Sequence, residues 1–185
     1  MYYGHVYKSS IVDGPGVRVS IYVSGCRKHC FGCHNQETRN FKFGQPYTEE
    51  TENEILEALN HDYIQGFTLC GGEPYEEENQ RECVKLLRKI KEQYPNKDIW
   101  SWTGYEYADL LEGGVKHCEV TDELLSYIDV IVVGEFVLSK RDISDANRWR
   151  GSTNQRVIDL NKTRASGKVV MLADIPNNDN NLMLN

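Results

Sequence analysis

Three cysteines lie close together near the start of the chain, and their side chains could bind a metal centre. Cys26, Cys30 and Cys33 follow the spacing C-x3-C-x2-C and make up half of the six cysteines. A tetrahedral zinc site needs four ligands, and His29 or His34 could supply the fourth. An iron–sulfur cube with three cysteine ligands instead keeps one iron open for a substrate. The spacing alone leaves both kinds of site open, together with three ordinary thiols.

A second candidate site is the sequence Gly71-Gly72-Glu73-Pro74. Paired glycines leave backbone groups exposed, Glu73 places a carboxylate beside them, and Pro74 stiffens the turn. Such a site could receive a cationic amino group. Taken alone, the sequence is equally consistent with an ordinary turn.

The composition is typical of a soluble globular protein, with 39% hydrophobic and 26% charged residues. The net charge of −7 disfavours nucleic-acid binding, because contacts to phosphates need a basic surface. No apolar run is long enough for a membrane span, and the N-terminus shows no secretion signal. We therefore expect a cytoplasmic protein, whose clustered cysteines serve metal or redox chemistry. The isolated Cys70, Cys83 and Cys118 are expected to be small buried residues.

Strands and helices alternate along the chain and must position these two sites. Apolar runs predict strands at residues 17–23, 66–70, 98–102, 130–133 and 155–160, and a short edge strand at 168–172. Helical spacing predicts a helix capped by Thr48, a helix at 77–94, and one or two helices at 106–127, with Thr121 capping the second. Each candidate site directly follows a strand, where parallel α/β folds gather their ligands.

This order predicts an α/β fold, a partial and open TIM-like barrel of parallel strands with outer helices. A closed eight-stranded barrel typically needs about 250 residues, more than this chain has. We expect one domain at residues 1–160. Residues 161–185 are expected to form a C-terminal extension that is partly disordered from Pro176 onward.

The two sites and three further stretches carry a resemblance to a known family. A C-x3-C-x2-C segment after the first strand, with Gly-Gly-Glu-Pro after the second, resembles the radical S-adenosylmethionine (SAM) superfamily. Within it, Asp-Gly-Pro-Gly-Val-Arg at residues 13–18 resembles the activating enzymes of glycyl-radical proteins. Residues 97–105 and 149–155 resemble the activating proteins of anaerobic (class III) ribonucleoside-triphosphate reductase. Gly32 also matches them, since most of the superfamily has an aromatic residue there.

The resemblance implies a specific chemistry. Members hold a [4Fe-4S] cluster through three cysteines, and SAM chelates the fourth iron through its amino and carboxylate groups. One electron from the cluster cleaves the sulfur–C5′ bond, and the 5′-deoxyadenosyl radical abstracts hydrogen from a glycine of the reductase. The implied partners are the large catalytic subunit of this reductase and a low-potential electron donor such as flavodoxin, with no nucleic acid and no membrane.

The resemblance also implies roles for individual residues. The three clustered cysteines match the cluster ligands and are the catalytic residues, and the Gly-Gly-Glu turn matches the site for the methionyl amino group. Gly32, Cys33 and His34 match positions beside the adenine of SAM. Thr103 and Tyr105 are weaker candidates for contacts to SAM, equally consistent with packing or capping.

Two positions depart from the family pattern. His34 stands where tyrosine is frequent, as in formate-lyase activators. Val-Gly-Glu-Phe at residues 133–136 replaces the usual Asp-Gly-x-Phe, so an acidic contact is lost or has moved to Glu135.

Three other functions remain as alternatives. Formate-lyase-type activating enzymes are usually longer and lack the Arg-Gly-Ser-Thr-Asn-Gln stretch, and a deazaguanine-type radical SAM synthase would not need the motif at residues 13–18. A non-catalytic zinc-binding module would leave the Gly-Gly-Glu-Pro sequence unexplained.

Overall fold

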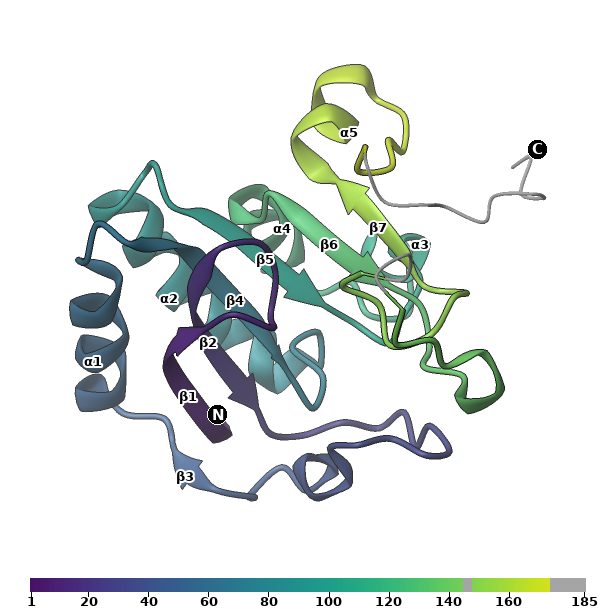
Figure 1. The fold of residues 1–185 in the computed structure, drawn as a ribbon, viewed down its shortest axis with the longest axis horizontal. Helices are drawn as coiled ribbons and strands as arrows, with labels where there is room; N and C mark the ends of the chain where they lie inside the picture. The colour runs from purple at the N-terminus through teal and green to yellow at the C-terminus, as the bar shows by residue number, and fades with distance from the viewer. Residues whose placement is uncertain (145–147, 174–185) are drawn as a thin grey trace.

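The computed structural model describes residues 1–144 and 148–173, which are organised around one seven-stranded sheet (Figure 1). The strands lie in the order β3-β1-β2-β4-β5-β6-β7. Their bounds are β1 (Tyr2–Ser10), β2 (Val17–Val23), β3 (Gln45–Pro46), β4 (Ile64–Gly71), β5 (Asp98–Trp102), β6 (Val130–Val133) and β7 (Arg156–Asp159). The four central strands β2, β4, β5 and β6 are parallel, whereas β1, β3 and β7 pair antiparallel.

The prediction of parallel strands is therefore confirmed in the centre of the sheet and wrong at its edges. The sheet is open, with β3 at one end and β7 at the other, and the curvature of a partial barrel stays a prediction. Strand β7 was expected in the parallel set. It runs antiparallel to β6, and the described residues between the two strands contain the 3-10 turn η2 (Leu138–Lys140) but no α-helix of the kind that usually forms a parallel crossover.

In the described part of the chain, five α-helices accompany the sheet: α1 (Glu49–Leu59), α2 (Glu77–Gln93), α3 (Tyr107–Leu110), α4 (Thr121–Tyr127) and α5 (Leu160–Ser166), with a 3-10 turn η1 (Gln36–Arg39) after the cysteines. Thr48 caps α1 as predicted, since its hydroxyl accepts from the Thr51 amide. Thr121 does not cap α4 but is its first residue. Its hydroxyl accepts from the Cys118 amide over 2.8 Å and so caps the preceding turn. No helix within the described residues is long and apolar enough to cross a membrane.

The chain after β7 differs from the prediction. Residues 168–172 form no strand but one antiparallel bridge, between Met171 and Ile158, because Gly167 ends α5 with a φ of +67° and the chain returns along β7 only briefly. The expected disordered tail from Pro176 lies outside the described residues.

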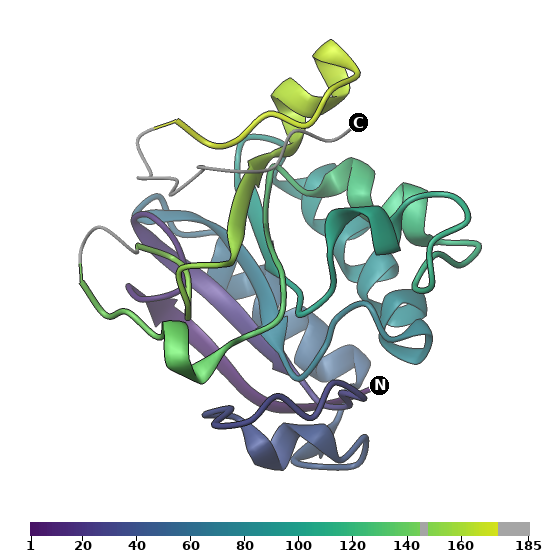
Figure 2. The same cartoon turned by 90° about the vertical axis from the view of Figure 1, so that its right-hand side faces the viewer.

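The two faces of the sheet are covered differently, and this difference creates the site. Helices α1 to α4 bury the larger apolar cluster against one face, with Ile21, Phe67 and Ile131 contributed by the strands. The other face carries a smaller cluster around Trp100 and Val132. Figure 2 shows α2 and α4 on one side of the sheet and the chain after β6 on the other. The helix-free face keeps a cavity at the carboxyl ends of the parallel strands.

Candidate metal centre and cofactor cavity

The carboxyl ends of β2, β4, β5 and β6 lie at one edge of the sheet because these strands are parallel. This edge holds a cavity of about 370 Å³. Seven of the eight predicted site residues line it: Cys26, Cys30, Cys33, His34, Gly71, Gly72 and Glu73. The fold therefore brings the cysteine segment and the Gly-Gly-Glu-Pro turn to one place.

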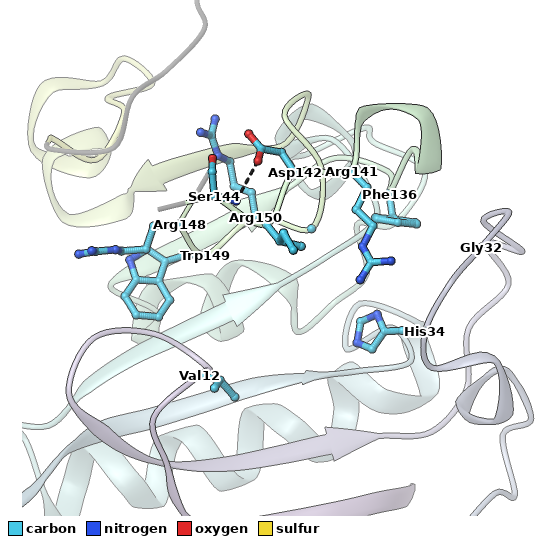
Figure 3. A pocket seen from close by; sticks show the side chains of 12 residues that line it. Val12, Gly32, His34, Phe136, Arg141, Asp142, Ser144, Arg148, Trp149 and Arg150 are labelled. Carbon is cyan, nitrogen blue, oxygen red and sulfur yellow. Dashed lines mark hydrogen bonds between the residues drawn. The ribbon is translucent and has the colours of Figure 1, made fainter. Parts of the chain in front are cut away.

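The eighth predicted residue, Gly32, lies at an adjoining hollow of about 650 Å³ (Figure 3). His34 lines both hollows, whereas Gly32 lines only the larger one. In Figure 3 the side chain of Arg141 extends across this hollow toward His34. Both Gly32 and His34 are exposed, so this part of the cysteine segment faces the open mouth of the site.

The three cysteines are free thiols, each partly buried. Burial raises the pKa of Cys26 to about 11, and burial followed by the nearby charge of Glu135 raises the pKa of Cys30. The thiols of Cys26 and Cys30 are therefore protonated at neutral pH in the ligand-free chain. A bound metal centre would supply the positive charge that makes their thiolates stable, since coordinating thiols are deprotonated.

The donor types suit an iron–sulfur cluster, because cysteine thiolates are its usual ligands and the thiols of Cys26, Cys30 and Cys33 line one cavity. Within the described residues, no three His, Cys, Asp or Glu side chains form a group that could hold a single metal ion. Of the two possible fourth ligands of a zinc site, His29 is exposed and does not line the cavity, whereas His34 lines it together with the three cysteines.

The backbone holds the two motifs against each other. The amide of Gly72 donates to the Val23 carbonyl over 2.7 Å, and the amide of Glu73 donates to the Gly25 carbonyl over 2.9 Å. A Cβ atom on Gly72 would lie 2.8 Å from the carbonyl oxygens of both Gly25 and Thr38. Only glycine permits this approach, which places the turn directly beneath the cysteine segment.

Glu73 is a buried carboxylate with three donors around it. It accepts hydrogen bonds from the Thr103 hydroxyl and the Gly104 amide, both at 2.8 Å, and from the Tyr75 amide at 3.1 Å. Burial outweighs these bonds and raises the pKa of Glu73 to about 7. A cationic group bound in the cavity would stabilise the ionised carboxylate, because an opposite charge favours the charged form.

Thr103, Tyr105 and Glu135 lie at different places around the cavity. Thr103 lines the cavity, whereas Tyr105 does not and lies beneath the ammonium of Lys28, 4.6 Å from its ring centre. Glu135 points back toward the cysteine segment, with its carboxylate 3.8 Å from Nζ of Lys28. The altered Val-Gly-Glu-Phe sequence thus keeps an acidic group beside the site.

Three residues that shape the cavity had no individual role predicted from the sequence, although Asp13 and Trp149 belong to stretches that carry the resemblance. Asp13 and Tyr22 both line it, and the Tyr22 hydroxyl donates to Asp13 Oδ1 over 2.5 Å. Trp149 lines both hollows with a φ of +69°, rare for a bulky residue, and its carbonyl accepts from Trp102 Nε1 over 2.9 Å. The alternating pattern of the strand at residues 17–23 could have indicated which face of the sheet the Tyr22 side chain lies on. Trp149 was singled out only as the first residue of the stretch at 149–155, with no role of its own.

Comparison with known proteins agrees with this site. Residues 12–158 match a family model described as a 4Fe-4S single cluster domain. An anaerobic ribonucleoside-triphosphate reductase-activating protein of Enterobacteria phage T4 is 39% identical over 157 residues, covering 85% of this chain and 93% of that protein. The protein of the same name from Escherichia coli K12 is 40% identical over 159 residues, covering 85% and 97%. The one from Vibrio cholerae is 39% identical over 157 residues, covering 84% and 96%. The chain therefore belongs to the family of anaerobic ribonucleoside-triphosphate reductase-activating proteins and contains a 4Fe-4S single cluster domain.

Proposed function

We propose that this protein activates an anaerobic ribonucleoside-triphosphate reductase by reductive cleavage of SAM at a [4Fe-4S] cluster, which leaves a glycyl radical on the large catalytic subunit. The observation that carries the proposal is the shared cavity, where three partly buried thiols face the Gly-Gly-Glu turn. A cluster held by the three thiolates of Cys26, Cys30 and Cys33 keeps one iron free for a substrate.

In this proposal, each group of residues in the cavity has a separate binding role. Cys26, Cys30 and Cys33 hold the cluster, and the turn at Glu73 receives the amino group of SAM. His34 and its neighbours in the cysteine segment lie beside the adenine. When bound, the cluster supplies the electron that cleaves the sulfur–C5′ bond, and the resulting 5′-deoxyadenosyl radical takes a hydrogen atom from the reductase glycine. The protein contributes binding, orientation and exclusion of water.

Anaerobic reconstitution tests this proposal. The chain is loaded with iron and sulfide, reduced chemically or with flavodoxin, and mixed with SAM and the large reductase subunit. We expect 5′-deoxyadenosine, methionine and a glycyl radical signal in electron paramagnetic resonance. A colourless zinc protein would refute the cluster. A loaded protein that cleaves SAM but leaves no radical on the reductase would refute the assigned partner.

A further inference from the structure

The turn that follows β4 continues into α2, and two of its polar side chains bind the cysteine segment directly. Asn79 donates from Nδ2 to the Ser24 carbonyl over 3.0 Å. Glu76 accepts from the backbone amide of Arg27 over 2.9 Å, one residue after Cys26. Helix α2 therefore anchors the backbone on both sides of the first cysteine.

Glu76 has an unusual environment for an acidic side chain. It is fully buried, and its second oxygen accepts from Nη1 of Arg27 at 2.6 Å and from Nζ of Lys116 at 2.7 Å. The Tyr105 hydroxyl lies 3.5 Å from its first oxygen. Burial opposes ionisation, but the hydrogen bonds from Lys116 and Arg27 outweigh it and lower the pKa of Glu76. The carboxylate is therefore ionised and joins the cysteine segment, α2, and the segments that carry Tyr105 and Lys116.

We infer that Glu76 is a positioning residue for the metal centre, which fixes the backbone at Arg27 so that the Cys26 thiolate is held in its ligating position. This inference rests on the proposed cluster ligands and adds a residue outside the ligand set. Buried groups that hold metal ligands in place typically change metal affinity or activity by about 10- to 100-fold when they are replaced.

The charge of Glu76 should also affect the reduction potential of the cluster. Glu76 interacts electrostatically with Cys26, and it neutralises the two cations of Arg27 and Lys116 beside the site. Replacing Glu76 by glutamine removes this negative charge and the ion pair of Lys116, while Arg27 keeps its pair with Glu78. Positive charge favours the reduced cluster, so the reduction potential should rise.

The test compares Glu76→Gln with a matched control, Glu78→Gln. Glu78 binds the same Arg27 guanidinium, at 2.6 and 3.1 Å, but is 51% exposed and pairs through the side chain of Arg27. Both variants and the wild type are reconstituted with iron and sulfide. The rate of iron loss to a chelator and the potential of the cluster are then measured. We expect Glu76→Gln to lose iron about tenfold faster than wild type and to have a higher potential, with Glu78→Gln close to wild type.

Two outcomes overturn the inference in different ways. If wild type takes up no iron and sulfide, the cluster ligands themselves are wrong, and the role of Glu76 falls with them. If wild type is loaded and Glu76→Gln matches Glu78→Gln in both iron loss and potential, only the role of Glu76 is refuted.

A measurement on wild type covers the case in which Glu76→Gln fails to fold. Amide hydrogen exchange of the cluster-free chain should show the Arg27 amide at least about tenfold slower than the amide of the exposed Gly32, because a buried carboxylate accepts its hydrogen. Equal exchange rates at the two amides would overturn the inference.

Discussion

The hydroxyl of Thr103 donates a hydrogen bond of 2.8 Å to Oε1 of Glu73, which joins the segment after β5 to the turn after β4. Replacing Thr103 by valine keeps the shape of the side chain and removes this donor. A hydrogen bond to a charged group contributes about 1.5 kcal/mol or more, so we expect about tenfold weaker binding of SAM by the reconstituted protein. Equilibrium dialysis measures this, with Ser126→Ala in α4 as a control. Unchanged affinity would show that Glu73 does not depend on Thr103.

The buried Glu73 carboxyl should make the stability of the ligand-free chain depend on pH. Its pKa is about 7 in the folded state and near 4.5 in the unfolded state, so unfolding releases a proton between these values and stability falls as pH rises from 4.5 to 7. Glu73→Gln has no carboxyl at this position, so this fall in stability between pH 4.5 and 7 should be absent from the variant. One pKa unit corresponds to about 1.4 kcal/mol, so the variant should gain up to about 3 kcal/mol relative to wild type across this interval and keep a constant difference above it. Urea unfolding at several pH values measures the difference. A difference that does not change with pH would contradict a raised pKa.

Gly72→Ala should displace the cysteine segment. The added Cβ atom would meet two backbone carbonyl oxygens at 2.8 Å, and neither can move without its strand or loop. We expect a loss of about 1 to 3 kcal/mol in the free energy of unfolding and poorer iron uptake. Gly113→Ala is a control for backbone strain, because Gly113 has a positive φ of +82°, which Gly72 lacks, and has nothing within 4 Å of the added atom. That variant should keep full iron uptake, and any decrease in its free energy of unfolding measures the cost of backbone strain alone.

Cys26→Ala should abolish cluster assembly and SAM cleavage while the chain still folds. The thiol is partly buried at the cavity and is not part of the apolar core. Iron and sulfide analysis after reconstitution checks the first part, and circular dichroism checks the second. Cys118→Ala removes a cysteine outside the cavity and should retain normal iron content. Cleavage of SAM by Cys26→Ala would show that the ligand assignment is wrong.

Arg18→Met should destabilise the sheet. Arg18 is fully buried and pairs with Asp98, and it donates to the Thr68 hydroxyl at 2.8 Å and to the Phe67 carbonyl at 2.9 Å. Loss of one partner of a buried pair leaves the other groups uncompensated, so we expect a loss of about 3 kcal/mol in urea unfolding. Lys85→Met breaks an exposed pair with Glu82 and should cost less than about 1 kcal/mol. Similar losses in the two variants would contradict this account.

Much of the fold could be predicted because the controlling interactions are local. The run Val130–Val133 is apolar at every position and forms the buried strand β6, and the apolar spacing of residues 77–94 became α2. Strand β1 was missed because its residues are mostly tyrosines and polar groups at a partly exposed edge. Residues 168–172 were predicted to be a strand because their composition resembles one, but they form only a single bridge to β7.

The sequence by itself determined the chemistry of the site. The spacing of Cys26, Cys30 and Cys33 and the Gly-Gly-Glu-Pro turn are properties of short segments, and the position of each after an apolar strand follows from neighbouring residues alone. Only the tertiary structure decided how these groups are held. The bonds from Thr103 to Glu73 and from Arg27 to Glu76 join residues 30 and 49 positions apart. No periodicity specifies such contacts, because they depend on which strands become neighbours and on which side chains are buried together.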